Sequence, residues 1–170
     1  MNNILTAEEI KNYKDIGSKI DANKINPIIS QAQDDLRDFL GMTFYFDILA
    51  NLTNPIYESL LNGSDFIYDR VTFHQDGLKA MLADLFVAKY LPQINTNMTP
   101  FGATTKLSTD SEPASESSLK NIAFMNKQMA GSKWEIIKLY LKENRFSFPN
   151  YNAFTDTIQS GERQLKFRKL

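Results

Sequence analysis

The side chains best suited to acid–base or metal chemistry surround one histidine. His74 is the only histidine in the chain, and Asp69 and Asp76 lie close to it in the sequence. Such a group can act as a general base or bind a metal ion. No second imidazole and no nucleophile accompanies it, and Phe73 precedes it. We therefore expect a structural role for His74.

A second group of carboxylates lies on a predicted helix, at Asp34, Asp35 and Asp38. Asp34 and Asp38 are four residues apart and share a helix face. Arg37 interrupts the run, and the spacing of a calcium-binding loop is missing. We expect a solvated face. In a ring of copies, Asp34 and Asp38 are the candidates for lining a channel, because an acidic wall repels phosphates and lets DNA slide.

The signatures of common enzyme classes are missing from the sequence. It contains no P-loop, no dinucleotide-binding glycine motif, no nucleophile elbow and no HExxH zinc motif. The absence of cysteine excludes disulfides, zinc–thiolate sites, iron–sulfur clusters and thiol nucleophiles. We therefore predict that the protein is not an enzyme and uses no metal or cofactor.

The C-terminus alternates basic with apolar residues, in the order Arg163, Leu165, Lys166, Phe167, Arg168 and Lys169. The cluster has three interpretations. It can contact a few phosphates of a nucleic acid, it can solubilise the chain, or it can dock onto a partner with Leu165 and Phe167 as anchors. The second and third carry equal weight and rank above the first, since apolar anchors between charges favour a partner.

Helical periodicity predicts the elements that carry these residues. The strongest helix spans 26–41, with Asn26 as N-cap, Pro27 as first residue and Gly41 at the C-terminal end. Its apolar face is predicted to comprise Ile25, Ile28, Ile29, Ala32, Leu36, Phe39 and Leu40.

Further helices are predicted around this one. A capping box of Thr6 and Glu9 precedes it, and short helices are expected within 43–52 and 56–61. The segment 63–77 is loop-like, with at most a brief extended piece. A helix that is apolar on nearly every side covers 77–91 and belongs in the middle of the fold. A last helix runs from a cap at Ser117 or Ser118 to Asn144.

The remaining segments are predicted to be an arm and a tail. Ser, Thr, Asn and Pro dominate 93–118, which favours a protruding loop or β-hairpin. The predicted fold class is therefore mainly α: a compact bundle of about four to five helices with this arm and an extended C-terminal tail. The predicted domains are a helical domain at 1–145 and a tail at 146–170.

Length and charge restrict the partners. The 170 residues are 42% hydrophobic, which suits one domain with a real core. The formal net charge of -1 argues against a protein that coats DNA or an anionic membrane. The polar, acidic N-terminus and the lack of an apolar run of about 20 residues lead us to expect no secretory signal and no membrane partner.

Several stretches together resemble a known family. They are LTAEEIKNYKDI, the step Asp21-x-x-Lys24-Ile25-x-Pro27, the helix ending at Leu40-Gly41, the helix from Gly77 to Tyr90, Thr99-Pro100-Phe101-Gly102, Ser111-Glu112-Pro113, and Phe148-Pro149-Asn150-Tyr151. They cover most of the chain and resemble the head-completion or head-to-tail connector proteins of Bacteroidetes phages, including the crAss-like phages. None of them is a catalytic signature.

The resemblance implies a structural virion protein that forms a ring, expected to be a dodecamer, between portal and tail. Such a ring completes the head and extends the channel through which DNA passes without sequence-specific binding. Its expected partners are copies of itself, the portal protein, and tail or further ring proteins. The expected location is the head–tail interface of the virion, after assembly in the host bacterial cytoplasm.

The resemblance also implies roles for the arm and the tail. The arm residues expected to contact a neighbouring subunit or ring are Pro100, Phe101, Gly102, Thr104, Lys106 and Leu107. The C-terminal cluster at 163–169 is the candidate for docking onto the portal. An alternative of another class is a small nucleic-acid-binding module, in which the basic tail acts with base-stacking aromatics at Phe146, Phe148, Tyr151 and Phe154.

Overall fold

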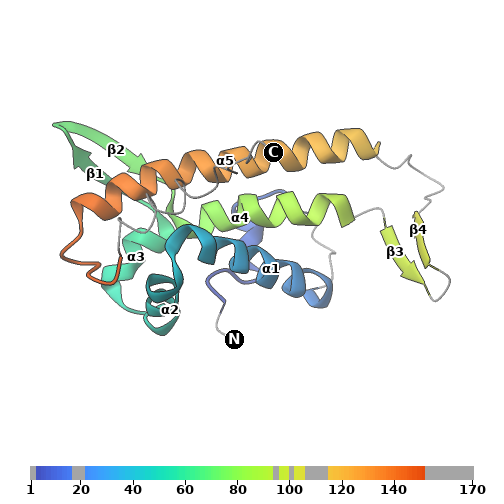
Figure 1. Ribbon diagram of the computed structural model, residues 1–170, viewed down its shortest axis with the longest axis horizontal. Helices are drawn as coiled ribbons and strands as arrows, with labels where there is room; N and C mark the ends of the chain where they lie inside the picture. Colours follow the sequence, from blue (N-terminus) through green and yellow to red (C-terminus); the bar gives the residue numbers. More distant parts are fainter. Residues whose placement is uncertain (1–2, 17–21, 94–95, 100–101, 106–114, 152–170) are drawn as a thin grey trace, which may run out of the picture.

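The computed structural model describes residues 3–16, 22–93, 96–99, 102–105 and 115–151, and the protein is mainly helical. The predicted fold class is confirmed (Figure 1). Its helices and strands are η1 (Glu9–Asn12), α1 (Ala22–Leu40), α2 (Met42–Ala50), α3 (Pro55–Asn62), β1 (Ser64–Tyr68), β2 (Val71–Gln75), α4 (Gly77–Tyr90), η2 (Leu91–Gln93), β3 (Thr96–Thr99), β4 (Gly102–Thr105) and α5 (Glu116–Glu143).

Helix α4 forms the centre of the fold. It packs against α1, α3 and α5, and it runs antiparallel to both α1 and α5 (Figure 1). Leu78, Met81, Leu82 and Phe86 are fully buried, as expected for a helix that is apolar on nearly every side. The prediction that this helix lies in the middle is confirmed.

Helix α1 begins at Ala22, five residues before Pro27, its predicted first residue. Pro27 is therefore inside the helix, and the predicted cap at Asn26 is wrong. Proline is normally disfavoured inside a helix, because it lacks the N–H that would bond to the preceding turn. The additional turn holds Ile25, which is 1% exposed and extends the apolar face. Gly41, the predicted C-terminal residue of this helix, follows α1 with a positive φ of 74°, but its ψ of 155° lies outside the left-handed helical region.

The segment between α3 and α4 is a β-hairpin, so the loop predicted at 63–77 is wrong. Strands β1 and β2 pair antiparallel, with Phe66 opposite Phe73. Asp69 and Arg70 form the two-residue turn, and both have positive φ, 48° and 66°. Such turns usually carry Asn-Gly or Asp-Gly, and the lack of this signature hid the hairpin from the sequence.

Gln75 and Gly77 fix this hairpin to the start of α4. The buried Gln75 amide donates to Ser64 Oγ (3.2 Å) and accepts from the Gly77 N–H (2.8 Å). Gly77 has a φ of +88°, and a Cβ there would lie 2.5 Å from the carbonyl oxygen of Leu61. Only glycine fits this close approach.

The segment after α4 contains the predicted hairpin. Strands β3 and β4 pair antiparallel, with Thr99 opposite Gly102. Figure 1 shows them beyond the C-terminal end of α4, apart from the helices. The backbone pairing of β3 with β4 confirms the prediction of a protruding β-hairpin in this segment.

Helix α5 is the longest element and passes through Gly131-Ser132 without a break. Its 28 residues span about 40 Å. The N-cap is Ser115, whose hydroxyl accepts from the Ser118 N–H (3.2 Å), so the predicted cap at Ser117 or Ser118 is wrong. The predicted end at Asn144 is confirmed as the C-cap.

The packed core continues beyond the domain boundary predicted at residue 145. Phe148 is 1% exposed and lies edge-to-face against Phe44 and Tyr57. Tyr151 packs against Phe44 and Trp134. Residues 146–151 therefore belong to the helical domain.

The predicted capping box holds the N-terminal segment. The Thr6 N–H donates to Glu9 Oε2 (3.0 Å), and the Glu9 N–H donates to Thr6 Oγ1 (3.2 Å). Lys79 of α4 also donates to Glu9 Oε1 (2.7 Å). Burial alone raises the pKa of Glu9, but the bonds from Lys79 and Thr6 outweigh it and lower this pKa below its usual 4.5.

Replacing Glu9 by Gln should therefore change stability in a pH-dependent manner. The folded pKa is lowered, so the carboxylate stabilises the fold above about pH 4.5, and this contribution disappears as the pH falls through the folded pKa. We expect Glu9→Gln to lose at most about 1 kcal/mol at pH 7 and less at pH 3. Urea unfolding at both pH values measures this. Glu8→Gln is the neighbouring control, and equal losses at both pH values would contradict the assignment.

The burial of Phe148 can be tested against Phe146. Phe148→Ala removes a ring packed among aromatic side chains and should cost about 3–5 kcal/mol of unfolding free energy. Phe146 is 87% exposed, so Phe146→Ala should cost less than about 0.5 kcal/mol. Chemical denaturation of both variants checks this. Equal effects would place 146–151 outside the cooperative core.

Candidate interaction surfaces on helix α5

A buried carboxylate fixes the position of α5. Asp84 of α4 is fully buried between two lysines: Lys14, which forms a close ion pair with it, and Lys133 of α5, whose Nζ lies 2.9 Å from Asp84 Oδ2. Within the described residues, neither carboxylate oxygen has a hydrogen bond of regular geometry. The two ammonium groups therefore compensate the cost of burying this charge.

The lysines connect this carboxylate to other parts of the fold. Lys14 also donates to Asn126 Oδ1 of α5 (2.9 Å), and Lys133 lies 3.6 Å from Asp76 Oδ2. The N-terminal segment, α4 and α5 thus meet at one charged cluster. Together with the buried apolar residues of α5, this cluster fixes the rotation at which α5 packs on α4. Sequence reasoning missed it because the apolar pattern of α4 concealed Asp84.

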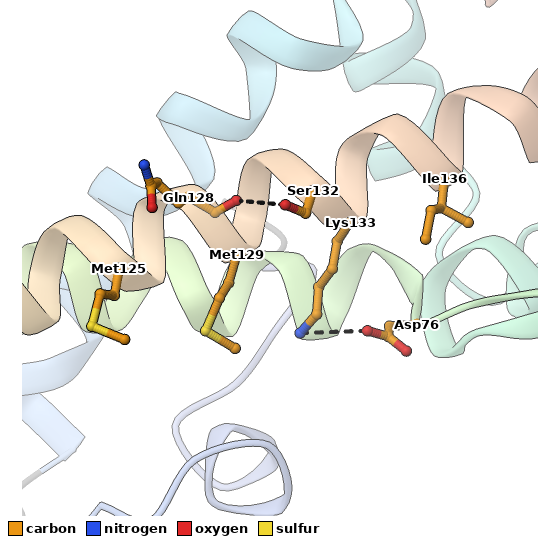
Figure 2. Close-up of a pocket in the computed structure, with 7 residues that line it drawn as sticks. All are labelled: Asp76, Met125, Gln128, Met129, Ser132, Lys133 and Ile136. Atoms are coloured by element: carbon orange, nitrogen blue, oxygen red, sulfur yellow. Dashed lines mark hydrogen bonds and ion pairs between the residues drawn. The ribbon is translucent and has the colours of Figure 1, made fainter.

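One flank of α5 borders an apolar groove of ≈ 490 Å³. Figure 2 shows Met125, Met129 and Lys133 pointing from α5 toward this groove, with Asp76 at its edge. Ile122, Met125 and Met129 follow helical spacing and are 46%, 60% and 46% exposed. Such a row of exposed apolar side chains is typical of an interaction surface.

The opposite flank of α5 is basic. Successive residues of a helix are rotated by about 100° around its axis. On this basis four lysines lie within an arc of about 60° on the surface of α5: Lys120, Lys127, Lys138 and Lys142. Phe124 lies beside them and is 61% exposed. Lys120 pairs with Glu116 (2.5 Å) and Lys138 with Glu135 (2.8 Å), so part of this charge is balanced locally. We call these five residues the basic flank.

The predicted acid–base candidate is a surface pair. His74 Nδ1 lies 2.6 Å from Asp65 Oδ1, its partner across the β1–β2 hairpin, and both side chains are well exposed. Asp76 is more distant, 3.9 Å from His74 Nε2. Among the described residues, no group of three or more His, Asp or Glu side chains is arranged to hold a metal ion. This geometry is consistent with a structural cross-strand contact.

The predicted acidic face lies on α1. Asp34 and Asp38 are exposed, as expected for a solvated face. Asp34 lies 3.7 Å from Arg37, and Asp35 pairs with Lys89 of α4 (2.9 Å). Asp34 and Asp38 thus lie on the solvent-exposed face of α1, whereas Asp35 faces α4.

The predicted contact residues of the arm and tail lie mostly outside the described residues. Gly102 and Thr104 are in β4, whose backbone pairs with β3. Pro100, Phe101, Lys106 and Leu107 lie outside, as does the cluster Arg163, Leu165, Lys166, Phe167, Arg168 and Lys169.

The aromatics proposed to stack bases have different surroundings. Phe148 is buried, so it cannot take this role. Tyr151 is half-buried against the core, and Phe146 is exposed with the Arg145 guanidinium 5.0 Å from its ring centre. Phe154 lies outside the described residues. The nucleic-acid alternative therefore loses one of its four aromatics.

The fold and these surfaces define a small helical domain with exposed apolar and basic flanks on one long helix. The chain belongs to the family of unknown function DUF6712, whose model matches residues 36–157, more than half of the sequence. Comparisons with curated proteins and with solved structures gave no match. None of the described helices is both long and apolar enough to cross a bilayer.

The buried cluster predicts a large effect of neutralising Asp84. Asp84→Asn leaves the ammonium groups of Lys14 and Lys133 without their anion and should cost about 3 kcal/mol of unfolding free energy. Asp38→Asn, on the exposed face of α1, should change it by less than about 0.5 kcal/mol. Thermal and urea unfolding of both variants measure this. Similar small values for both would show that the cluster does not hold α5 in place.

Proposed function

We propose that the protein is a structural subunit of a ring between the portal and the tail of a phage. The ring completes the head and extends its DNA channel. The observation that carries this proposal is the exposed apolar row on α5, in a domain whose β3–β4 hairpin extends away from the helices. Apolar surface of this kind is stabilised when a partner covers it.

The geometry of one small domain supports association into a ring. Closed rings need a heterologous contact, in which one surface of a subunit binds a different surface of the next. Helix α5 supplies one candidate surface, and the extended hairpin can reach a neighbour. The sequence resemblance to head-to-tail connector proteins supports the same function.

The remaining parts of the proposal concern partners. Copies of this chain form the ring, for which we propose twelve subunits, and the portal and tail or further ring proteins bind its two sides. In this arrangement Asp34 and Asp38 face the channel, the arm contacts a neighbouring subunit, and the cluster at 163–169 docks onto the portal. The location is the head–tail interface of the virion.

Co-assembly with the cognate portal tests this proposal. Electron microscopy of the mixture should show closed rings of this chain stacked on the portal. Met129→Asp puts a charge into the apolar row and should reduce ring occupancy on the order of tenfold. Asn150→Asp, an exposed loop change, should leave it unaltered. If the wild-type chain never enters a symmetric ring with the portal, the proposal is wrong.

A further inference from the structure

Within the described residues the protein has two separate antiparallel sheets of two strands each, β1–β2 and β3–β4. Each strand of such a sheet has an outer edge, where every second residue leaves its backbone N–H and C=O without a strand partner. Figure 1 shows β1–β2 near one end of the long axis of the molecule and β3–β4 at the other. The two hairpins therefore cannot pair within one copy. They can pair between successive copies, as a heterologous contact requires.

The turn of the first hairpin fixes which backbone groups of β1 point outward. Both turn residues have positive φ, as in a type I′ turn, so Tyr68 and Val71 beside them form a hydrogen-bonded pair. Hydrogen-bonded and non-bonded pairs alternate along the strands, and the N–H and C=O of Asp65 and Ile67 therefore point away from β2. Both residues are exposed, Ile67 to 67%. No backbone bond to another described segment uses these groups.

A groove of ≈ 430 Å³ lies along the same edge of β1. One of its sides is formed by the consecutive residues 64–67, and the other includes Tyr140, Glu143 and Asn144 at the end of α5. Because consecutive residues of a strand point to opposite faces, a groove lined by all four lies at the edge of β1 and not over one face. The carboxylates of Asp65 and Glu143, both exposed, place negative charge beside it.

The β3–β4 hairpin of another copy is suited to this edge. Within the described part of the chain it has no extensive contact with a helix (Figure 1), and an isolated two-stranded hairpin is only marginally stable in water. Its strands contain no charged residue and no proline, with which natural proteins usually block exposed edges. β4 has four residues and β1 has five, so their lengths match. Lys106 follows β4 directly and is complementary to the carboxylates of the groove.

The outward groups of β4 also match those of β1. Thr99 and Gly102 lie opposite one another with two residues between them, so they form the hydrogen-bonded pair next to this connection. The alternation then leaves the backbone N–H and C=O of Ala103 and Thr105 pointing away from β3. On both strands, the two residues with outward groups are separated by one residue, so the two sets can face each other.

We infer that β4 of one copy pairs antiparallel with β1 of the next copy, which joins the hairpins into one sheet in the order β2-β1-β4-β3. Ala103 then lies opposite Ile67. Thr105 lies opposite Asp65, and each of these two pairs exchanges two N–H···O bonds. This register brings Lys106 beside Asp65 at the groove. The main-chain bonds supply the affinity, as in other cases of strand addition. The inference rests on the proposed ring and names the strands through which the arm contacts its neighbour.

Disulfide trapping between two variants tests this contact, since the natural chain has no cysteine. One variant carries Ile67→Cys and the other Ala103→Cys, so a link between these positions can form only between copies. Opposite residues of a hydrogen-bonded pair have Cα atoms about 5.5 Å apart, within the span of about 4.4–6.8 Å that a disulfide bridges. In an equal mixture at about 1 mM protein in a glutathione buffer, we expect covalent pairs with one chain of each variant, separated by mass.

Thr72→Cys is the matched control for Ile67→Cys. Thr72 is exposed in the same hairpin, opposite Ile67, and its backbone groups point outward on the edge of β2. It should link to the Ala103→Cys chain on the order of tenfold less. Equal linkage from both positions, or linkage from neither, would overturn the inference. Links of the Ile67→Cys chain only to a second Ile67→Cys chain would show that β1 pairs with itself, and would overturn it as well.

Proline substitution tests whether main-chain bonds hold the contact. Ile67→Pro removes an outward N–H, and proline is tolerated on a sheet edge at such a position. It should reduce the disulfide between Asp65→Cys and Thr105→Cys chains on the order of tenfold. Thr72→Pro, which removes an outward N–H of β2, should leave this link unaltered. Circular dichroism checks that both proline variants are folded. Equal effects of the two prolines would contradict the inferred pairing.

The two proposals can fail separately. Links between positions 67 and 103 without any portal-bound ring would support the strand pairing and overturn the connector function. Portal-bound rings whose occupancy is unchanged by Ile67→Pro, and in which these links do not form, would leave the connector function intact and overturn the pairing.

Discussion

The buried charge of Asp84 is the constraint on which the rest of the structure depends. A carboxylate in the middle of the central helix is tolerable only if cations reach it, and Lys14 and Lys133 do so from the N-terminal segment and from α5. Both elements must then pack on α4 with one particular rotation. An apolar residue at this position would remove the charge pairing, and the rotation of α5 would then depend only on its packed residues, such as Trp134, Ile137 and Leu141.

Once α5 is fixed, its two flanks acquire separate characters. Met125 and Met129 line a groove on one side, with the exposed Ile122 preceding them on the helix, and the lysines with Phe124 lie on the other side. The buried face of α5, between these two flanks, packs against α4. A helix with one buried face and two different exposed flanks suits a subunit that contacts more than one neighbour, and this supports the proposed assembly more strongly than the nearly neutral net charge does.

Several local features could be predicted because each has a short-range cause. Gly41 ends α1 with a positive φ, Thr6 and Glu9 cap one another, and the apolar residues of α4 recur on every side. Other features depend on partners distant in sequence. The extra turn of α1 forms because Ile25 finds a place in the core in spite of Pro27, and the strands beside Asp69-Arg70 pair although the turn lacks its usual residues. Phe148 looked like part of a tail and is held by Phe44 and Tyr57.

The sequence by itself determined a mainly helical protein with a central apolar helix, a hairpin after it and no signature of catalysis. Periodicity, caps and missing motifs are properties of neighbouring residues, so they need no knowledge of the fold. Only the tertiary structure decided that Asp84 is buried between two lysines, that Phe148 belongs to the core, and which residues of α5 remain exposed. These outcomes depend on contacts between residues far apart in the chain, and the free energy of burying a charge or a ring is set by those contacts and not by the local sequence.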